Sequence, residues 1–112
     1  MSSYAPDSWV IIKIAGDDPH YRVLAGWAGG YTQGTSWRMN SGITRVEEDD
    51  TYFKFFGSSG SVYYCHKDMY GLRISNTYVW NAFKEKHGDL VELMDEETDW
   101  NNMDWIIGNE TV

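Results

Sequence analysis

Cysteine is nearly absent from this chain of 112 residues, which contains only Cys65. A single cysteine cannot form an internal disulfide bond, and this usage is typical of proteins in a reducing compartment. No apolar stretch approaches the ~20 residues of a membrane-spanning helix. The polar start of the chain, Met1 to Ser8, does not resemble a signal peptide. We therefore expect a soluble protein of the cytoplasm with no membrane partner.

Lysine and arginine are missing from the end of the chain. Residues 1–88 contain nine Lys or Arg and nine Asp or Glu, whereas residues 89–112 contain eight Asp or Glu and no Lys or Arg. The formal net charge of −8 therefore comes entirely from the end of the chain. The sequence lacks the basic footprint of a general nucleic-acid binder, so we expect no direct contact with nucleic acid. An acidic surface favours a partner with a basic surface instead.

Aromatic residues are abundant, at 16% of the chain, with six tryptophans and eight tyrosines. Each aromatic side chain buries a large area, so a chain of this length can still form one stable core. We expect a single domain over residues 1–112. Its β-rich body with one helix covers residues 1–94, and an acidic, tryptophan-containing C-terminal segment covers residues 95–112.

Apolar and β-branched runs predict the strands of the body. Residues 8–15 and 20–28 form an antiparallel hairpin, because the GDDP turn between them is too short for a parallel crossover. An extended piece begins at Ser36. The runs ITRVEE and TYFKFFG flank Asp49-Asp50 as a second hairpin, and SVYYCHK returns as a strand after an SSG turn.

One helix is predicted over about residues 76–87. Residues 75–77 (Ser-Asn-Thr) offer N-cap side chains, and Gly88 fits the C-terminal cap. Tyr78, Val79, Ala82 and Phe83 fall on one face of this helix. The run DLVELM after the helix predicts a final strand. The acidic segment is predicted to form a short helix from Thr98 or an ordered tail. The fold class is α+β, a curved antiparallel sheet of five or six strands packed on one helix.

Three motifs, YRVLAGWAGGY, SWRMNSGIT and GSSGSVYYCHKDMYG, resemble a family of small, uncharacterised accessory proteins of tailed bacteriophages. The resemblance spans roughly residues 9–72 and is carried by Gly26, Trp27, Gly30, Tyr31, Ser36, Trp37, Arg38, Ser41, Gly42, Gly60, Ser61, Val62, Tyr63, Cys65, His66 and Gly71. It implies the cytoplasm of an infected bacterium as the setting. Small phage accessory proteins often block a host enzyme or defence system, by contacting a protein or by sequestering a nucleotide messenger.

The stretch AGWAGGYTQGTSWRMNSGI combines five glycines with large aromatic residues. In one interpretation its tryptophans fill the core and its glycines permit close packing. In the other, the stretch forms a ligand site. An aromatic wall beside one arginine can stack a base and pair with a phosphate, and a serine adds a polar contact. The candidate ligand-binding residues are Trp27, Tyr31, Trp37, Arg38 and Ser41.

The acidic segment interleaves acids with tryptophans, which a purely solvating tail does not need. Its apolar side packs either on the protein's own body or on a partner, and both alternatives stay open. The candidate partner-binding residues are Glu96, Glu97, Asp99, Trp100, Asp104 and Trp105.

No set of catalytic residues can be recognised in the sequence. Cys65 and His66 are neighbours on a predicted strand, so their side chains point to opposite faces and cannot form a dyad or share a metal. GSSGS matches neither a nucleophile elbow nor a Walker loop, and is interpreted as a turn or an anion-holding backbone nest. We expect no metal and no cofactor.

The sequence thus predicts a non-enzymatic binding protein, a phage-encoded inhibitor of a host protein or defence system that uses an acidic surface. The first alternative is an oligomeric sponge that sequesters a nucleotide-like signalling anion. The second is a small hydrolase that uses His66 or His20 with an acid.

Overall fold

A computed structural model describes residues 2–29 and 34–105. The strands are β1 (Ser3–Tyr4), β2 (Ser8–Ile14), β3 (His20–Ala28), β4 (Thr35–Met39), β5 (Ile43–Glu48), β6 (Tyr52–Gly57), β7 (Val62–His66) and β8 (Val91–Leu93). One α-helix, α2 (Ile74–His87), lies between β7 and β8, and short 3₁₀ turns cover Lys67–Met69, Gly88–Leu90 and Trp100–Asn102. The α+β class and the predicted helix are confirmed.

The strands form two sheets of four, not the single sheet predicted from the sequence. One has the order β4-β3-β2-β8 and the other β1-β7-β6-β5, with β1 parallel to β7 and every other pairing antiparallel. The chain passes between them after β4, where Gly42 adopts a φ of +148°. Such a positive φ is readily accessible only to glycine. Among the described residues eight strands form where five or six were predicted, and the division into two sheets depends on this turn.

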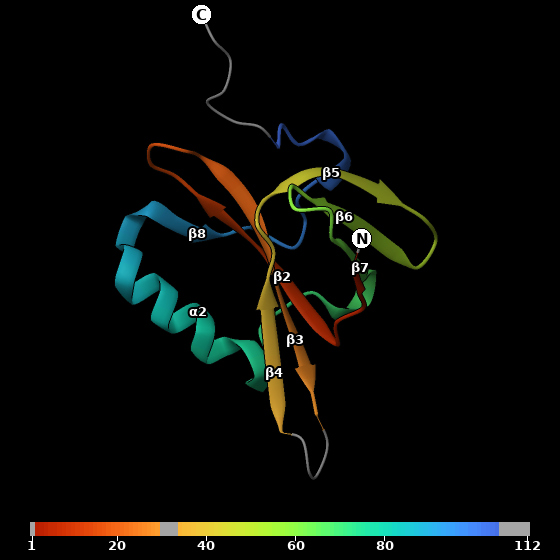
Figure 1. The fold of residues 1–112 in the computed structure, drawn as a ribbon, viewed down its shortest axis with the longest axis horizontal. Helices are drawn as coiled ribbons and strands as arrows, with labels where there is room; N and C mark the ends of the chain where they lie inside the picture. Colours follow the sequence, from red (N-terminus) through yellow and green to blue (C-terminus); the bar gives the residue numbers. More distant parts are fainter. Residues whose placement is uncertain (1, 30–33, 106–112) are drawn as a thin grey trace, which may run out of the picture.

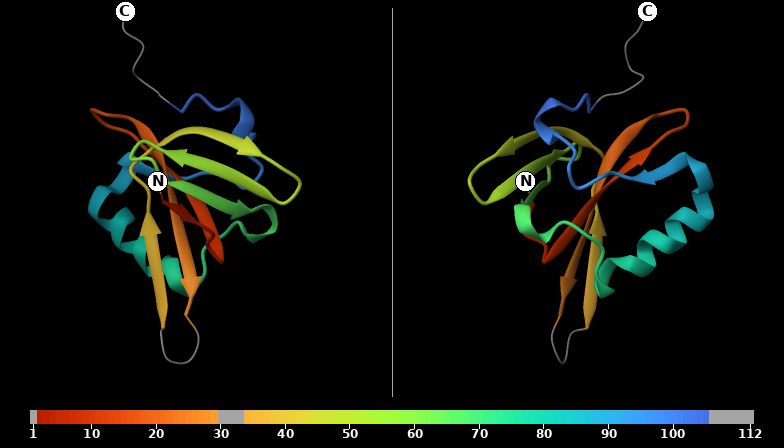
Figure 2. Two further views of the ribbon diagram at one scale, coloured as in Figure 1. Left: turned by 45° about the vertical axis from the view of Figure 1, so that its right-hand side comes forward. Right: turned by 180° about the vertical axis from the view of Figure 1, so that it is seen from behind.

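The molecule has three layers, with α2 on one face of the β4-β3-β2-β8 sheet and the second sheet on its other face (Figures 1 and 2). This follows from β2, in which every residue from Ser8 to Ile12 is buried. Since successive side chains of a strand point to opposite faces, such a strand must be covered on both sides. Trp9 and Ile11 enter the core between the sheets, whereas Val10 and Ile12 enter the core beneath the helix.

Helix α2 begins two residues earlier than predicted. Arg73 occupies the N-cap position, and its backbone N–H donates to Oδ1 of Asn76 at 2.7 Å. Residues 75–77 therefore lie in the first turn of the helix and not at the N-cap, although the side chain of Asn76 accepts from the N-cap N–H. At the other end Gly88 caps the helix at a φ of +59°, as predicted.

The predicted apolar face of α2 is partly wrong. Val79 is buried and Phe83 packs beneath the helix, but Tyr78 is 56% exposed and Ala82 is exposed. Trp80 packs against the core in their place. The buried face also includes Ser75 and Asn76, which lie against Gly26 of β3.

Beyond the helix, β8 pairs with β2 and confirms the predicted final strand. The chain then crosses the end of the sheets near β5, as the blue segment of Figure 1 shows. Within this segment only Trp100–Asn102 is helical, as a 3₁₀ turn, so the predicted helix from Thr98 does not form over the described residues. The remainder of the acidic segment, residues 106–112, lies outside the described residues.

Candidate functional site

The five predicted ligand residues do not converge on one site. In the register of β3 with β4, Trp27 pairs with Ser36, Gly26 with Trp37, and Ala25 with Arg38. Alternation therefore places Trp27 and Arg38 on one face of the sheet and Trp37 on the other. Trp37 lies on the helix side and is 45% exposed.

Trp27 and Arg38 are already engaged with the N-terminal strand. The indole Nε1 of Trp27 donates to the carbonyl oxygen of Ala5 at 3.0 Å. The guanidinium of Arg38 lies 4.6 Å from the centre of the Tyr4 ring, a cation–π contact. These contacts favour the structural interpretation of both residues.

Ser41 lies beyond the far end of β4 from Trp27. Its hydroxyl is 2.7 Å from the hydroxyl of Ser58 and accepts from the backbone N–H of Ser59. Ser41 therefore ties the β4–β5 connection to the GSSGS turn. Tyr31 lies outside the described residues.

The tryptophans of the acidic segment belong to the protein's own core. Trp100 is 2% exposed and Trp105 is 7% exposed, and both pack between the sheets against Phe55. Their rings are therefore not available to a partner, which corrects the candidate role of these two residues. Of the two alternatives, docking on the protein's own body holds for Trp100 and Trp105.

The acids of the same segment point outward. Asp95, Glu96, Glu97, Asp99 and Asp104 are all exposed. The two buried indoles thus hold a row of carboxylates against the body while leaving them in solvent.

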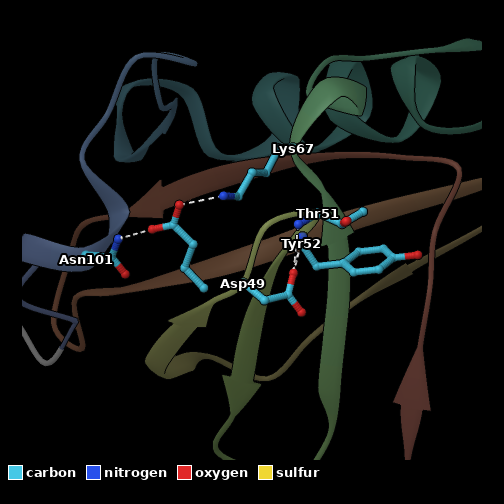
Figure 3. A network of polar contacts seen from close by, with 6 residues as sticks. Asp49, Thr51, Tyr52, Lys67 and Asn101 are labelled. Atoms are coloured by element: carbon cyan, nitrogen blue, oxygen red, sulfur yellow. Dashed lines mark hydrogen bonds and ion pairs between the residues drawn. The ribbon is translucent and has the colours of Figure 1, made fainter.

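A second group of acids, Glu47 to Asp50, lies at the β5–β6 turn and is joined to the segment through Glu48 (Figure 3). The Glu48 carboxylate accepts from Nζ of Lys67 at 2.6 Å and from Nδ2 of Asn101 at 2.5 Å. These two hydrogen bonds, that from Lys67 first, lower the pKa of Glu48. We call this group and the five segment acids the acidic surface.

Asp49 shapes the turn that presents this surface. Its carboxylate accepts from the backbone N–H groups of Tyr52 at 2.7 Å and Thr51 at 2.8 Å, and both bonds lower its pKa (Figure 3). Such side-chain capping of a turn is why aspartate is favoured there. The cations nearby are already paired, Lys67 with Glu48, Lys54 with Asp49 and Arg45 with Glu47.

A groove of about 660 Å³ has none of the predicted ligand residues Trp27, Trp37, Arg38 and Ser41 in its lining. One wall is the N-terminal stretch from Ala5 to Ser8, and the start of α2, from Arg73 to Ser75, forms another. Tyr52, His66 and Met69 close it from the second sheet, and Ala28 and Thr35 contribute from the ends of β3 and β4. No sequence motif marked it, because its residues come from six separate parts of the chain.

Cys65 and His66 lie on opposite faces of β7, as predicted. Cys65 is fully buried between the sheets, and burial raises the pKa of its thiol well above the ordinary value. His66 lines the groove, and its Nδ1 accepts from the backbone N–H of Asp68 at 3.1 Å. A buried neutral thiol is a poor nucleophile, so this pair does not support catalysis.

His20, the other histidine of the hydrolase alternative, is tied to its own turn. Its Nδ1 lies 2.6 Å from the carbonyl oxygen of Asp18, and its Nε2 accepts from Nε of Arg22 at 2.9 Å. In the described part of the chain, no three His, Cys, Asp or Glu side chains gather as metal ligands would.

Comparison with known proteins returned no matching family model, curated protein or solved structure. Within residues 2–29 and 34–105, no helix has the length and apolar character needed to cross a membrane.

Proposed function

We propose that this chain is a non-enzymatic binding protein whose acidic surface docks on the basic surface of a partner protein. The observation that carries the proposal is the burial of Trp100 and Trp105, at 2% and 7% exposure. It makes residues 95–105 part of the folded body. A solvating tail would not need to be held in this way.

A fixed acidic surface suits recognition better than a loose tail does. Carboxylates already held in place lose less conformational entropy on binding, and complementary charge speeds the encounter. The hydrogen bond from Asn101 to Glu48 adds the β5–β6 turn to the same surface. Glu47, Glu48 and Asp49 are paired with cations, whereas the segment from Asp89 to Trp105 contains no Lys or Arg, so the segment acids supply the net charge of the surface.

The resemblance to phage accessory proteins suggests what the partner is. The expected target is a host protein of an infected bacterium, such as an enzyme or a defence component. The proposed effect is inhibition by covering a basic surface that the host protein uses.

The test reverses three segment charges together, in the variant E96K/E97K/D99K. The wild-type chain and the variant are immobilised and exposed to a lysate of a bacterium that tailed phages infect, and retained proteins are identified by mass spectrometry. We expect a host protein retained by the wild type and lost with the variant. Retention should also weaken between about 50 mM and about 500 mM salt, because salt screens exposed charges.

A matched control is D17K/D18K/E85K, which makes the same change in net charge at exposed acids outside the acidic surface. This control should retain the host protein. Equal loss with both variants would mean that only net charge matters, and equal retention by both would show that the segment makes no contact. Either result contradicts the proposal.

A further inference from the structure

The groove has a positive end, formed by Arg73 and the N-terminus of α2. Arg73 takes part in no salt bridge within the described residues, and its guanidinium makes only a 3.4 Å contact to the carbonyl oxygen of Leu72. It stands at the N-terminus of α2, a helix of 14 residues, where the positive end of the helix dipole lies. The backbone N–H groups of Ile74 and Ser75 have no acceptor among the described residues.

A buried hydroxyl beside this end has no partner either. Ser8 is 1% exposed, lines the groove, and its Oγ makes no hydrogen bond. Alternation along β2 points it to the α2 side, together with Val10 and Ile12. Buried polar groups in proteins are nearly always hydrogen-bonded, so this Oγ, which has no partner among the described residues, favours a polar group bound in the groove.

The rest of the groove suits a ring with hydrogen-bonding substituents. Tyr52, Met69 and Pro6 supply aromatic and apolar walls, and Ile74 stands at the rim with 85% of its side chain exposed. The volume of about 660 Å³ lies within the ~300–1,000 Å³ typical of small-ligand sites.

Two further polar groups in the groove restrict which functional groups the ligand can carry. Because Nδ1 of His66 accepts a hydrogen bond from Asp68, the proton of the neutral ring is on Nε2, which is then a donor. Asp7 accepts from the N–H of Ala28 through Oδ2 at 2.7 Å, which leaves Oδ1 as an acceptor for a hydroxyl or amino group. A ligand that carries only negative charge would be repelled by Asp7.

We infer that the groove binds a small organic anion of the mononucleotide kind, in which a ring, a hydroxyl-bearing middle and one anionic group are combined. The anionic group lies against Arg73 and the first N–H groups of α2, within reach of Ser8. A hydroxyl faces Asp7, and the ring packs against Tyr52 and Met69. This site is separate from the acidic surface, so it can fail without affecting the proposed partner.

The test is a titration of the ¹⁵N-labelled full chain with AMP, adenosine and inorganic phosphate, followed by amide chemical shifts. We expect AMP to shift the amides of Ile74, Ser75 and His66, with weaker effects of adenosine and of phosphate. Arg73→Gln should weaken AMP binding by about tenfold or more, since a charge-assisted hydrogen bond is lost. Adenosine binding should be unchanged in that variant.

Two variants sharpen the result. Arg38→Gln removes the arginine that the sequence suggested for a nucleotide, so it should leave AMP binding intact. Ser8→Ala should weaken AMP binding by several-fold while leaving the unliganded protein no less stable, because its hydroxyl is unpaired there.

Four outcomes would overturn the inference. The first is that no probe shifts the amides of the groove, and the second is that adenosine binds as tightly as AMP. The third is that AMP binding is lost in Arg38→Gln but not in Arg73→Gln. The fourth is that phosphate binds as tightly as AMP, which would mark an adventitious ion only. Shifts at the groove that depend on protein concentration without nucleotide would show a second copy as its occupant and would also overturn it.

Discussion

Replacing Trp100 by alanine should destabilise the whole protein, although Trp100 lies in an acidic segment near the end of the chain. Its ring centre is 6.1 Å from that of Trp9, 6.1 Å from that of Phe55 and 6.0 Å from that of Tyr70. Burial of ~200 Å² of aromatic surface at ~25 cal/mol per Å² contributes about 5 kcal/mol at most. Measured Trp→Ala losses in cores are about 3–5 kcal/mol.

Urea unfolding followed by far-UV circular dichroism measures this loss. Since domains of this size have a free energy of unfolding of about 5–15 kcal/mol, the midpoint should fall steeply. Trp37→Ala is the matched control, because Trp37 is 45% exposed and its loss should cost about 1 kcal/mol or less. If Trp100→Ala costs no more than Trp37→Ala, the segment is not part of the core and the reasoning is refuted.

Three further predictions concern the body. Burial raises the pKa of both Tyr63 and Tyr70 to about 12 from 10.0, so the folded state holds more protons than the unfolded state between these values. Stability should therefore be unaffected below pH 10 and fall as the pH rises towards 12, and the fall should be smaller in Tyr70→Phe; an unchanged slope would contradict this. Gly26→Ala should cost about 1–3 kcal/mol, because an added Cβ would meet Oγ of Ser75 at 2.2 Å, and Ser75→Ala should restore part of the loss; thermal unfolding that shows no rescue would exclude this clash. Asn40→Ala should cost about 1–3 kcal/mol in urea unfolding, because Oδ1 of Asn40 accepts from the buried N–H of Val23 at 2.9 Å, and a neutral result would show that this bond is replaced.

The strands and the helix could be predicted because their signals are local. Each strand from residues 8 to 66 lies where alternation and turn residues indicated it, and the cap at Gly88 formed as expected. The division into two sheets could not be predicted in this way, since it depends on which strands meet after the turn at Gly42. The buried run from Ser8 to Ile12 was the available clue, because a strand buried on both faces needs two covering layers.

The candidate sites were also predictable only where their signal is local in the sequence. The acidic end was visible as a charge imbalance, but whether Trp100 and Trp105 face inward depends on tertiary packing. Trp37 and Arg38 are neighbours on one strand and therefore point to opposite faces in any register. Only the position of Trp27 beside Arg38 depended on the register of β3 with β4, which the sequence does not give. The groove could not be predicted, because its lining comes from residues far apart in the sequence.

We propose that residues 95–105 are a fixed part of the folded body and present their acids as a binding surface. Backbone ¹⁵N relaxation of the full chain tests this most directly. We predict order parameters of about 0.85 across residues 95–105, equal to those of β2, whereas values below about 0.6 would mean a mobile tail and contradict the account.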